Sequence, residues 1–324
     1  MEISELRDYF SSSRNHIAAQ AERLRTHSPE LVVPIACSPI RGIVCAVDAG
    51  FVTLPLHGLD VHVSKTCTVL FEYEAGKLGP VYYFPSKFPQ TQVDAQVSGD
   101  AHESVVNASL VRISKELDGA ISASTMMVQH AKTPKILLLD GSLLPLASDR
   151  PANGGIEYDN VIIQYRMLYK QCKENNIVLV GVIKDPKGSL FVDAKVEGLK
   201  TSDTLFVDAF LKSGERTREL PVATRNTPVL KELGLTQDSI MCCYLKLGND
   251  LPLRIEFFEY ESIETVANMV SSLCTPSKMF TYPAALIEVD LRAMLDPQEI
   301  ERVLKELELH AGMRPLRRNA RPFR

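Results

Sequence analysis

Three apolar runs without alternating polar positions predict strands that are buried on both faces: residues 41–48, 136–139 and 177–183. Such strands lie at the centre of a sheet that helices cover on both sides. Each run ends on charged residues, namely Asp48, Asp140 and the pair Lys184 and Asp185. Ligands bind at this edge of open α/β sheets, although the aspartate–glycine step at 140–141 is also an ordinary turn signal.

Periodic patterns in the rest of the chain predict the other elements. Apolar residues at helical spacing indicate helices at 2–25, from about 98, near 121–130, at 156–175, near 262–273 and at 297–309. Strand-like runs within 51–85 extend the first strand into a meander of about three antiparallel strands, and further strands are predicted at 239–246 and 253–258. Three antiparallel strands, a helix, a buried strand, a helix and another buried strand form the order of the ribonuclease H-like fold. We therefore expect an α/β protein with a mixed sheet flanked by helices.

We expect one domain with insertions. The parts are an N-terminal helix at 1–26, a core at about 41–185 and 239–310, an insertion at about 186–235 and a basic tail at 312–324. The insertion is predicted because the segment between the buried strands is mixed and polar.

Composition narrows the class of protein. Hydrophobic residues make up 45% of the chain and charged residues 23%, which is an ordinary balance for a globular protein. No apolar run approaches the length of a membrane span. The seven cysteines form no C-x-x-C pair, which argues against zinc and fits reduced thiols in the cytoplasm. The net charge of −4 argues weakly against nucleic acid as a partner, although a local basic groove can exist on an acidic protein.

Carboxylates that converge at a sheet edge repel each other unless a cation holds them. Hard oxygen ligands suit Mg²⁺ or Mn²⁺, and two such ions about 3.5–4 Å apart can clamp a phosphodiester during its displacement. In a ribonuclease H-like sheet the first strand, the first helix and the fourth strand each contribute an acid. The candidate ligands are Asp48, Asp140, an acid on the helix between them and one from the C-terminal part.

The helix between the two aspartates offers Glu103 in its first turn and Glu116 near its other end. We prefer Glu103, because the first turn is expected to face the first strand. The helix dipole also favours a glutamate there without any ligand, and Glu116 is the alternative.

Two further residues are candidates for the site. Lys184 is placed to hold a phosphate or to orient the nucleophile, or else it is a solvated lysine at a strand end. Asp290 follows Tyr282 and Pro283 across an apolar run and would supply the last carboxylate, unless it only caps a helix.

Five segments together resemble the NurA family of DNA end-processing nucleases: CAVDAGF, KILLLDGSLL, LVGVIKDP, LPLRIEFFE and YPAALIEVDLRAML. The resemblance runs over about 41–295 and is weakest across 186–235. It implies a ribonuclease H-like fold, a Mn²⁺-dependent deoxyribonuclease, a homodimer, and work with the hexameric HerA translocase in resecting DNA ends for double-strand break repair. It further implies that Asp48 and Asp140 bind metal, that Glu103 is the helical ligand, and that Lys184 is the lysine of a GVSKD-like motif. Asp290 stands where many members have a histidine.

Two other classes of protein remain as alternatives. The segment VDAGFVT is similar to the first phosphate loop of actin-like ATPases, but a second D-x-G loop followed by threonine and a Gly-Gly adenosine motif are not evident. The chain could also be a scaffold without catalytic activity that binds DNA or a motor, which its acids argue against.

Overall fold

The computed structural model describes residues 3–56, 58–97, 101–151, 154–223, 227–274 and 281–312. The predicted basic tail beyond Gly312 lies outside these residues. The helices are α1 Ile3–His27, α2 Ala101–Val128, α3 Ile156–Glu174, α4 Leu190–Lys195, α5 Asp203–Phe210, α6 Pro228–Leu233, α7 Ile263–Leu273, α8 Ala284–Ala293 and α9 Pro297–Ala311. Two short 3-10 turns are η1 Pro29–Leu31 and η2 Ala147–Asp149. Among the described residues, none of these helices combines the length and apolar character that a membrane span requires.

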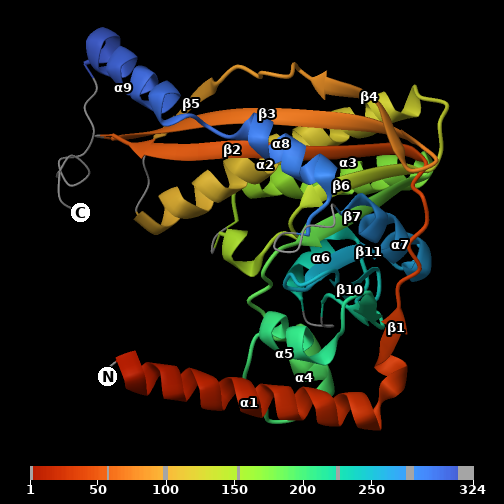
Figure 1. Cartoon of the computed structure of the whole chain (residues 1–324). Helices are drawn as coiled ribbons and strands as arrows, with labels where there is room; N and C mark the ends of the chain where they lie inside the picture. The colour runs from red at the N-terminus through yellow and green to blue at the C-terminus, as the bar shows by residue number, and fades with distance from the viewer. Residues whose placement is uncertain are drawn as a thin grey trace.

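A mixed sheet forms the centre of the molecule (Figure 1). Its strands are β1 Val32–Pro34, β2 Gly42–Pro55, β3 Leu59–Glu74, β4 Lys77–Phe84, β5 Gln92–Val97, β6 Lys135–Asp140, β7 Ile177–Ile183, β8 Glu215–Thr217, β9 Leu220–Pro221, β10 Ile240–Lys246 and β11 Leu253–Phe258. They follow the order β1-β8-β10-β11-β7-β6-β2-β3-β4, with β5 beside β3 and β9 beside β10. The pairs β2–β6 and β6–β7 are parallel and the other pairs are antiparallel.

Helices cover both faces of the central strands, as the unbroken apolar runs predict. Successive side chains of a strand point to opposite faces, so Cys45 and Val47 of β2 pack in a core with α2 and α3. The intervening Val44 and Ala46 pack in a second core with α7 and α8. The expected ribonuclease H-like arrangement, a mixed sheet flanked by helices, is therefore confirmed.

Several elements differ from the prediction. Strand β2 continues seven residues past Asp48, to Pro55, and pairs with β3 along its whole length. This extension forms an arm that lies next to α9 (Figure 1). Its apolar side chains pack against Leu295 and against Val303 and Leu307 of α9. Helix α2 is one helix of 28 residues where the sequence predicts two pieces. Strands β1 and β5 are not predicted at all.

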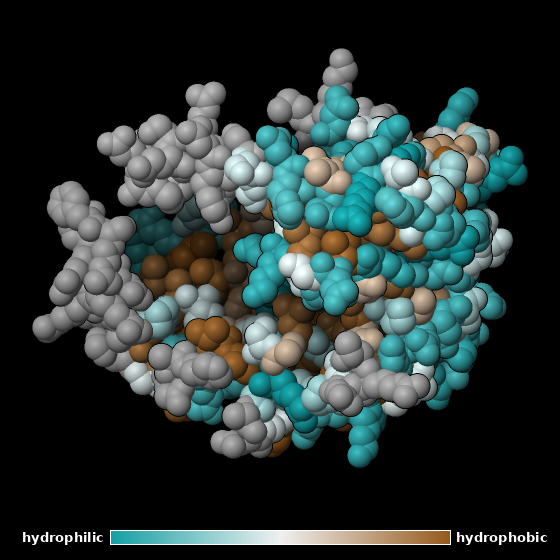
Figure 2. All heavy atoms as spheres, turned by 90° about the horizontal axis from the view of Figure 1, so that it is seen from below, coloured by the Kyte–Doolittle hydropathy of each residue, from teal (hydrophilic) through white to brown (hydrophobic). Residues whose placement is uncertain are grey.

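The polar segment 186–235 is joined to the rest of the fold by its strands and by its helices, of which α6 packs against α3. Its strands β8 and β9 pair with β10 of the main sheet. Its helices α4 and α5 contribute Phe191, Phe206 and Phe210 to a core with Ile17 and Ala21 of α1. Figure 2, which views the molecule from below, shows a hollowed face with apolar side chains inside the hollow.

Candidate active site

A cavity of about 240 Å³ opens at the edge of the sheet where β2 leaves β6. Its charged lining residues are Asp48, Arg112, Glu116, Asp140, Asp149 and Arg254. These residues come from two strands, one helix, a turn and a distant strand, so only the folded chain brings them together.

The two aspartates are neighbours because of strand register. Val47 pairs in parallel with Leu139, so Asp48 and Asp140 directly follow paired residues on adjacent strands. Strands lie about 4.8 Å apart in a sheet, and the alternation of side chains turns both carboxylates toward the α8 face. Gly141 follows with φ +143°, a conformation that L-residues rarely adopt, so glycine allows the sharp turn at this point.

Asp140 is held by two hydrogen-bonding partners. The Nζ atom of Lys184 lies 2.9 Å from its Oδ2 atom, and the hydroxyl of Tyr282 donates to its Oδ1 atom over 2.9 Å. The Lys184 ammonium also lies 4.4 Å from the centre of the Tyr282 ring. Burial, followed by the charge of Asp140, raises the pKa of the Tyr282 phenol far above its usual range. Tyr282 is therefore a hydrogen-bond donor at neutral pH.

The pKa of Asp48 is affected by two nearby acids, Asp140 and Asp290. This pKa is raised to about 6, first by burial and also by the charges of Asp140 and Asp290, while a hydrogen bond from the Ala49 N–H (2.8 Å) opposes the rise. The Asp290 side chain hydrogen-bonds to Asp48, although it comes from α8, where it is exposed. The structure thus brings Asp290 close to Asp48.

The helical acid at the cavity is Glu116, and the preference for Glu103 is not supported by the placement of α2. The pKa of Glu116 is raised to about 7, first by burial and also by the charges of Asp48 and Asp140. Arg112, whose Nη1 atom lies 2.6 Å from Oε1, opposes the rise. Glu103 lies about 20 Å away along the helix axis, at 1.5 Å per residue, and is exposed. The second half of α2 crosses β2, since a Cβ atom at Gly119 would lie 2.6 Å from Val47.

Two residues of β11 were not predicted from the sequence: Arg254, which lines the cavity, and Glu256, which lies behind it. Glu256 is fully buried and accepts hydrogen bonds from the Ser142 Oγ atom (2.8 Å), the Leu143 N–H (2.8 Å) and Arg254 (2.7 Å). It therefore fixes the turn that follows Asp140. Arg254 faces the cavity with a buried Nε–H that has no hydrogen-bond partner among the described residues. The signal in the sequence was the Arg-x-Glu alternation inside the apolar run LPLRIEFFE.

The donor set fits a divalent cation. Asp48, Glu116, Asp140 and Asp290 supply hard carboxylate oxygens, which Mn²⁺ and Mg²⁺ prefer. In the described part of the chain no three acidic, histidine or cysteine side chains are gathered closely enough to bind a metal ion as they stand. Asp140 is instead paired with the Lys184 ammonium, a cation that occupies the carboxylate a metal would use.

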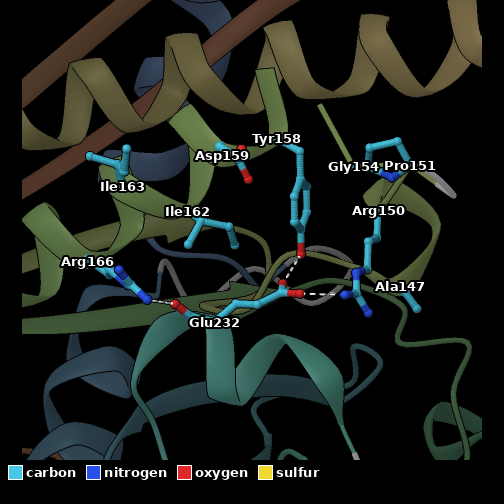
Figure 3. A pocket seen from close by; sticks show the side chains of 10 residues that line it. All are labelled: Ala147, Arg150, Pro151, Gly154, Tyr158, Asp159, Ile162, Ile163, Arg166 and Glu232. Carbon is cyan, nitrogen blue, oxygen red and sulfur yellow. Dashed lines mark hydrogen bonds and ion pairs between the residues drawn. The ribbon is translucent and has the colours of Figure 1, made fainter. Parts of the chain in front are cut away.

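A larger cavity of about 690 Å³ is lined by residues of η2, α3 and α6 and of the segment 150–154 (Figure 3). Its central acid, Glu232, accepts hydrogen bonds from Arg150 (2.5 Å) and Tyr158 (2.5 Å), and its carbonyl oxygen accepts one from Arg166. The charge of Glu232 is thus already matched by neighbours. The smaller cavity, where several acids converge, is the better candidate for catalysis.

Comparison with known proteins identifies the family of the chain. The family model of the NurA domain matches residues 70–294, a range that includes Glu116, Asp140, Lys184 and Asp290 but not Asp48. A search of curated proteins found no match.

Solved NurA structures share the fold over nearly the whole chain. The NurA nuclease from Sulfolobus solfataricus is 14% identical, with a TM-score of 0.63 over 96% of this chain and 98% of that one. A NurA structure bound to dAMP and manganese is 11% identical, with a TM-score of 0.59 over 95% of this chain and 96% of that one. A NurA structure with manganese is 10% identical, with a TM-score of 0.59 over 95% and 98% of the two chains. Because the family model covers more than half of its residues, the chain belongs to the NurA family.

Proposed function

We propose that this protein is a Mn²⁺-dependent deoxyribonuclease that hydrolyses phosphodiester bonds at the cavity between β2, β6 and α2. The observation that carries the proposal is the convergence of Asp48, Glu116 and Asp140 from three separate elements on one cavity. Solved NurA structures with manganese and with dAMP support the choice of metal and of substrate class. Membership of the NurA family also favours this function over an actin-like ATPase.

The four carboxylates of Asp48, Glu116, Asp140 and Asp290 would hold the metal, with two ions as the expected number. The metal would supply Lewis-acid stabilisation of the phosphate and a water of lowered pKa. Mg²⁺ is the alternative cation, because it has the same preference for oxygen ligands.

The protein's own cations are placed to bind the substrate. Lys184, at the end of β7, lies at the same edge of the sheet as Asp140 and can contact a phosphate once another cation neutralises that aspartate. Arg254 lines the cavity, so its guanidinium is a further candidate to bind a phosphate of the substrate. Tyr282 fixes the orientation of Asp140 through its hydroxyl.

The test is cleavage of end-labelled single- and double-stranded DNA in Mn²⁺ by Asp140→Asn. Asparagine keeps the shape of the side chain but removes its charge, so we expect loss of cleavage with an unchanged circular dichroism spectrum. Asp48→Asn should behave in the same way. Asp159→Asn, in the larger cavity, is the matched control and should cleave normally. Full activity of Asp140→Asn would refute the assignment of the site.

The biological setting is a proposal that rests on the family. We propose that the protein resects DNA ends in double-strand break repair in the cytoplasm, as a homodimer, together with a HerA-type hexameric translocase. A nuclease with net charge −4 has little long-range attraction for DNA, whose phosphates dominate binding. A motor that feeds DNA ends to the cavity would compensate for this weak attraction.

A further inference from the structure

An exposed aromatic ring with two neighbouring cations lies just beyond β4, the strand at one end of the sheet order. Phe88 is 74% exposed. The Arg292 guanidinium lies 5.4 Å from the centre of its ring, and the Lys87 ammonium lies 6.0 Å from it. Both cations also lie 5.8 Å from the ring of Tyr83. The two rings and two cations form one cluster, which we call the Phe88 cluster.

The Phe88 cluster is built from two elements and is partly fixed. Glu288 accepts hydrogen bonds from the Tyr83 hydroxyl (2.7 Å) and from the Nε atom of Arg292 (2.8 Å), so the guanidinium is tied to α8 beside the ring. Phe88 is fixed through its backbone N–H, which donates to the Ser86 Oγ atom over 3.2 Å. Two cations therefore lie beside the ring while much of the ring remains open to solvent.

The position of the Phe88 cluster relates it to the candidate active site. Asp48 pairs with Cys67 on β3, and the Cys67 thiol contacts the Ser86 carbonyl oxygen at 3.8 Å. Strand spacing then places Ser86, two residues before Phe88, about 10 Å from Asp48. Helix α8, which packs on β2 and β3, carries both Asp290 of the site and Arg292 of the cluster (Figure 1).

Single-stranded nucleic acid fits this chemistry better than a protein partner does. Sites for single strands combine aromatic rings, on which bases stack, with nearby cations that meet the phosphates. Protein interfaces also use aromatic residues and arginine, but lysine is depleted at their centres. Lys87 and the distance to the acidic cavity both favour the nucleic acid.

We propose that Phe88, with Lys87 and Arg292, forms a subsite on which a base of single-stranded DNA stacks next to the bond to be cut. The subsite deepens the proposed function and rests on it. Through this subsite the enzyme would bind single-stranded ends even without the metal.

Binding of a fluorescein-labelled single-stranded oligonucleotide, measured by anisotropy in EDTA, tests the subsite without cleavage. We expect Phe88→Ala to bind about 5- to 100-fold more weakly, which is the usual effect of removing one stacking contact. Phe88→Trp should bind at least as well as the wild type. Phe84→Ala is the matched control and should change little. Phe84 is also an exposed phenylalanine, but it follows Tyr83 on β4, so its side chain points to the face of the strand opposite to Tyr83.

An abasic nucleotide scanned along the oligonucleotide gives a second, independent readout. One position should weaken wild-type binding by a similar factor, and Phe88→Ala should add no further loss at that position. In Mn²⁺, Phe88→Ala should raise KM on single strands while kcat stays within about twofold, because a uniform binding contact is lost.

The outcomes separate the subsite from the proposed function. Normal single-strand binding and cleavage by Phe88→Ala would overturn the subsite and leave the nuclease standing. Unchanged DNA binding together with an altered sedimentation coefficient would assign the surface to a protein contact and overturn the subsite. A wild-type chain that binds no single-stranded DNA and cuts none would overturn both proposals.

Discussion

Two acids of the cavity, Asp48 and Glu116, hold their protons more tightly than free carboxyls do. The pKa of Asp48 is raised to about 6 and that of Glu116 to about 7, in both cases first by burial. Between about pH 4 and pH 7 the folded chain therefore binds protons that the unfolded chain has released. The contribution of these groups to the free energy of unfolding is complete below about pH 4 and is lost as pH rises through 6 and 7.

This proton binding predicts how pH and metal change stability. In EDTA, the melting temperature should fall as pH rises from 5 to 8, and Glu116→Gln should remove part of that fall. Mn²⁺ competes with these protons, so it should raise the melting temperature more at pH 8 than at pH 5. Thermal unfolding followed by circular dichroism measures both effects. Equal stabilisation by Mn²⁺ at the two pH values would contradict the assignment of these acids as ligands.

The choice between the two helical glutamates gives a second prediction at this scale. Glu116→Gln should lower the cleavage rate by about a hundredfold or more, because it removes a charge at the reacting phosphate. Glu103→Gln serves as the control and should retain activity, since Glu103 lies far along α2 from the cavity. Rates on end-labelled DNA in Mn²⁺ decide between them, and the reverse result would restore the original preference for Glu103.

At the scale of the element, the close approach of α2 to β2 places Glu116. A Cβ atom at position 119 would lie 2.6 Å from the Val47 Cγ1 atom and 3.3 Å from the Thr66 Cγ2 atom. Replacing glycine by alanine within a helix normally stabilises it by about 1 kcal/mol. Here the added methyl group must push α2 away from the sheet, at a cost of about 1–3 kcal/mol.

Gly119→Ala should therefore lower both the free energy of unfolding and the cleavage rate, because Glu116 lies one turn earlier on the same helix. Urea denaturation and the DNA cleavage assay measure the two effects. Val47→Ala in the same chain makes room for the methyl group, so the double variant should recover part of both losses. A Gly119→Ala chain as stable and as active as the wild type would show that α2 does not depend on this contact.

The central elements could be predicted because their pattern depends on burial alone. Strands β6 and β7 lie between two helical layers, so their apolar runs give the correct bounds within one residue. The continuation of β2 past Asp48 could not be predicted, because the arm is only partly buried and depends on packing against the distant helix α9.

The site was predictable only in part, for a related reason. Asp48, Asp140 and Lys184 follow apolar strands, so the sequence marks them, and the structure brings them to one edge. The crossing point of α2 on the sheet is set by a tertiary contact, and the glycine at 119 was its one trace in the sequence. Arg254 was missed because a charge inside a strand resembles ordinary alternation until its neighbours are known.

The whole molecule presents a conflict between its charge and its proposed substrate. A protein with net charge −4 must bind DNA through local cations, and those at the site and the Phe88 cluster include Lys184, Arg254, Lys87 and Arg292. Dimerisation would bring two such sets of cations together. They would form a locally basic surface on a protein whose net charge is negative. The tail beyond Gly312 adds five more arginines at 314, 317, 318, 321 and 324.

The last prediction concerns assembly. We expect the chain to sediment as a dimer at micromolar concentration, and to resect long DNA processively only with a HerA-type translocase and ATP. A chain ending at Gly312 should bind DNA or the motor more weakly, with the salt dependence of DNA binding reduced if the arginines meet phosphates. Unchanged binding by the truncated chain would show that the tail has no role in the assembly. The proposals of a dimer and of a partner translocase would not be affected. A monomer that resects processively by itself would refute the assembly, since the local cations of one chain would then suffice to hold DNA against the overall negative charge.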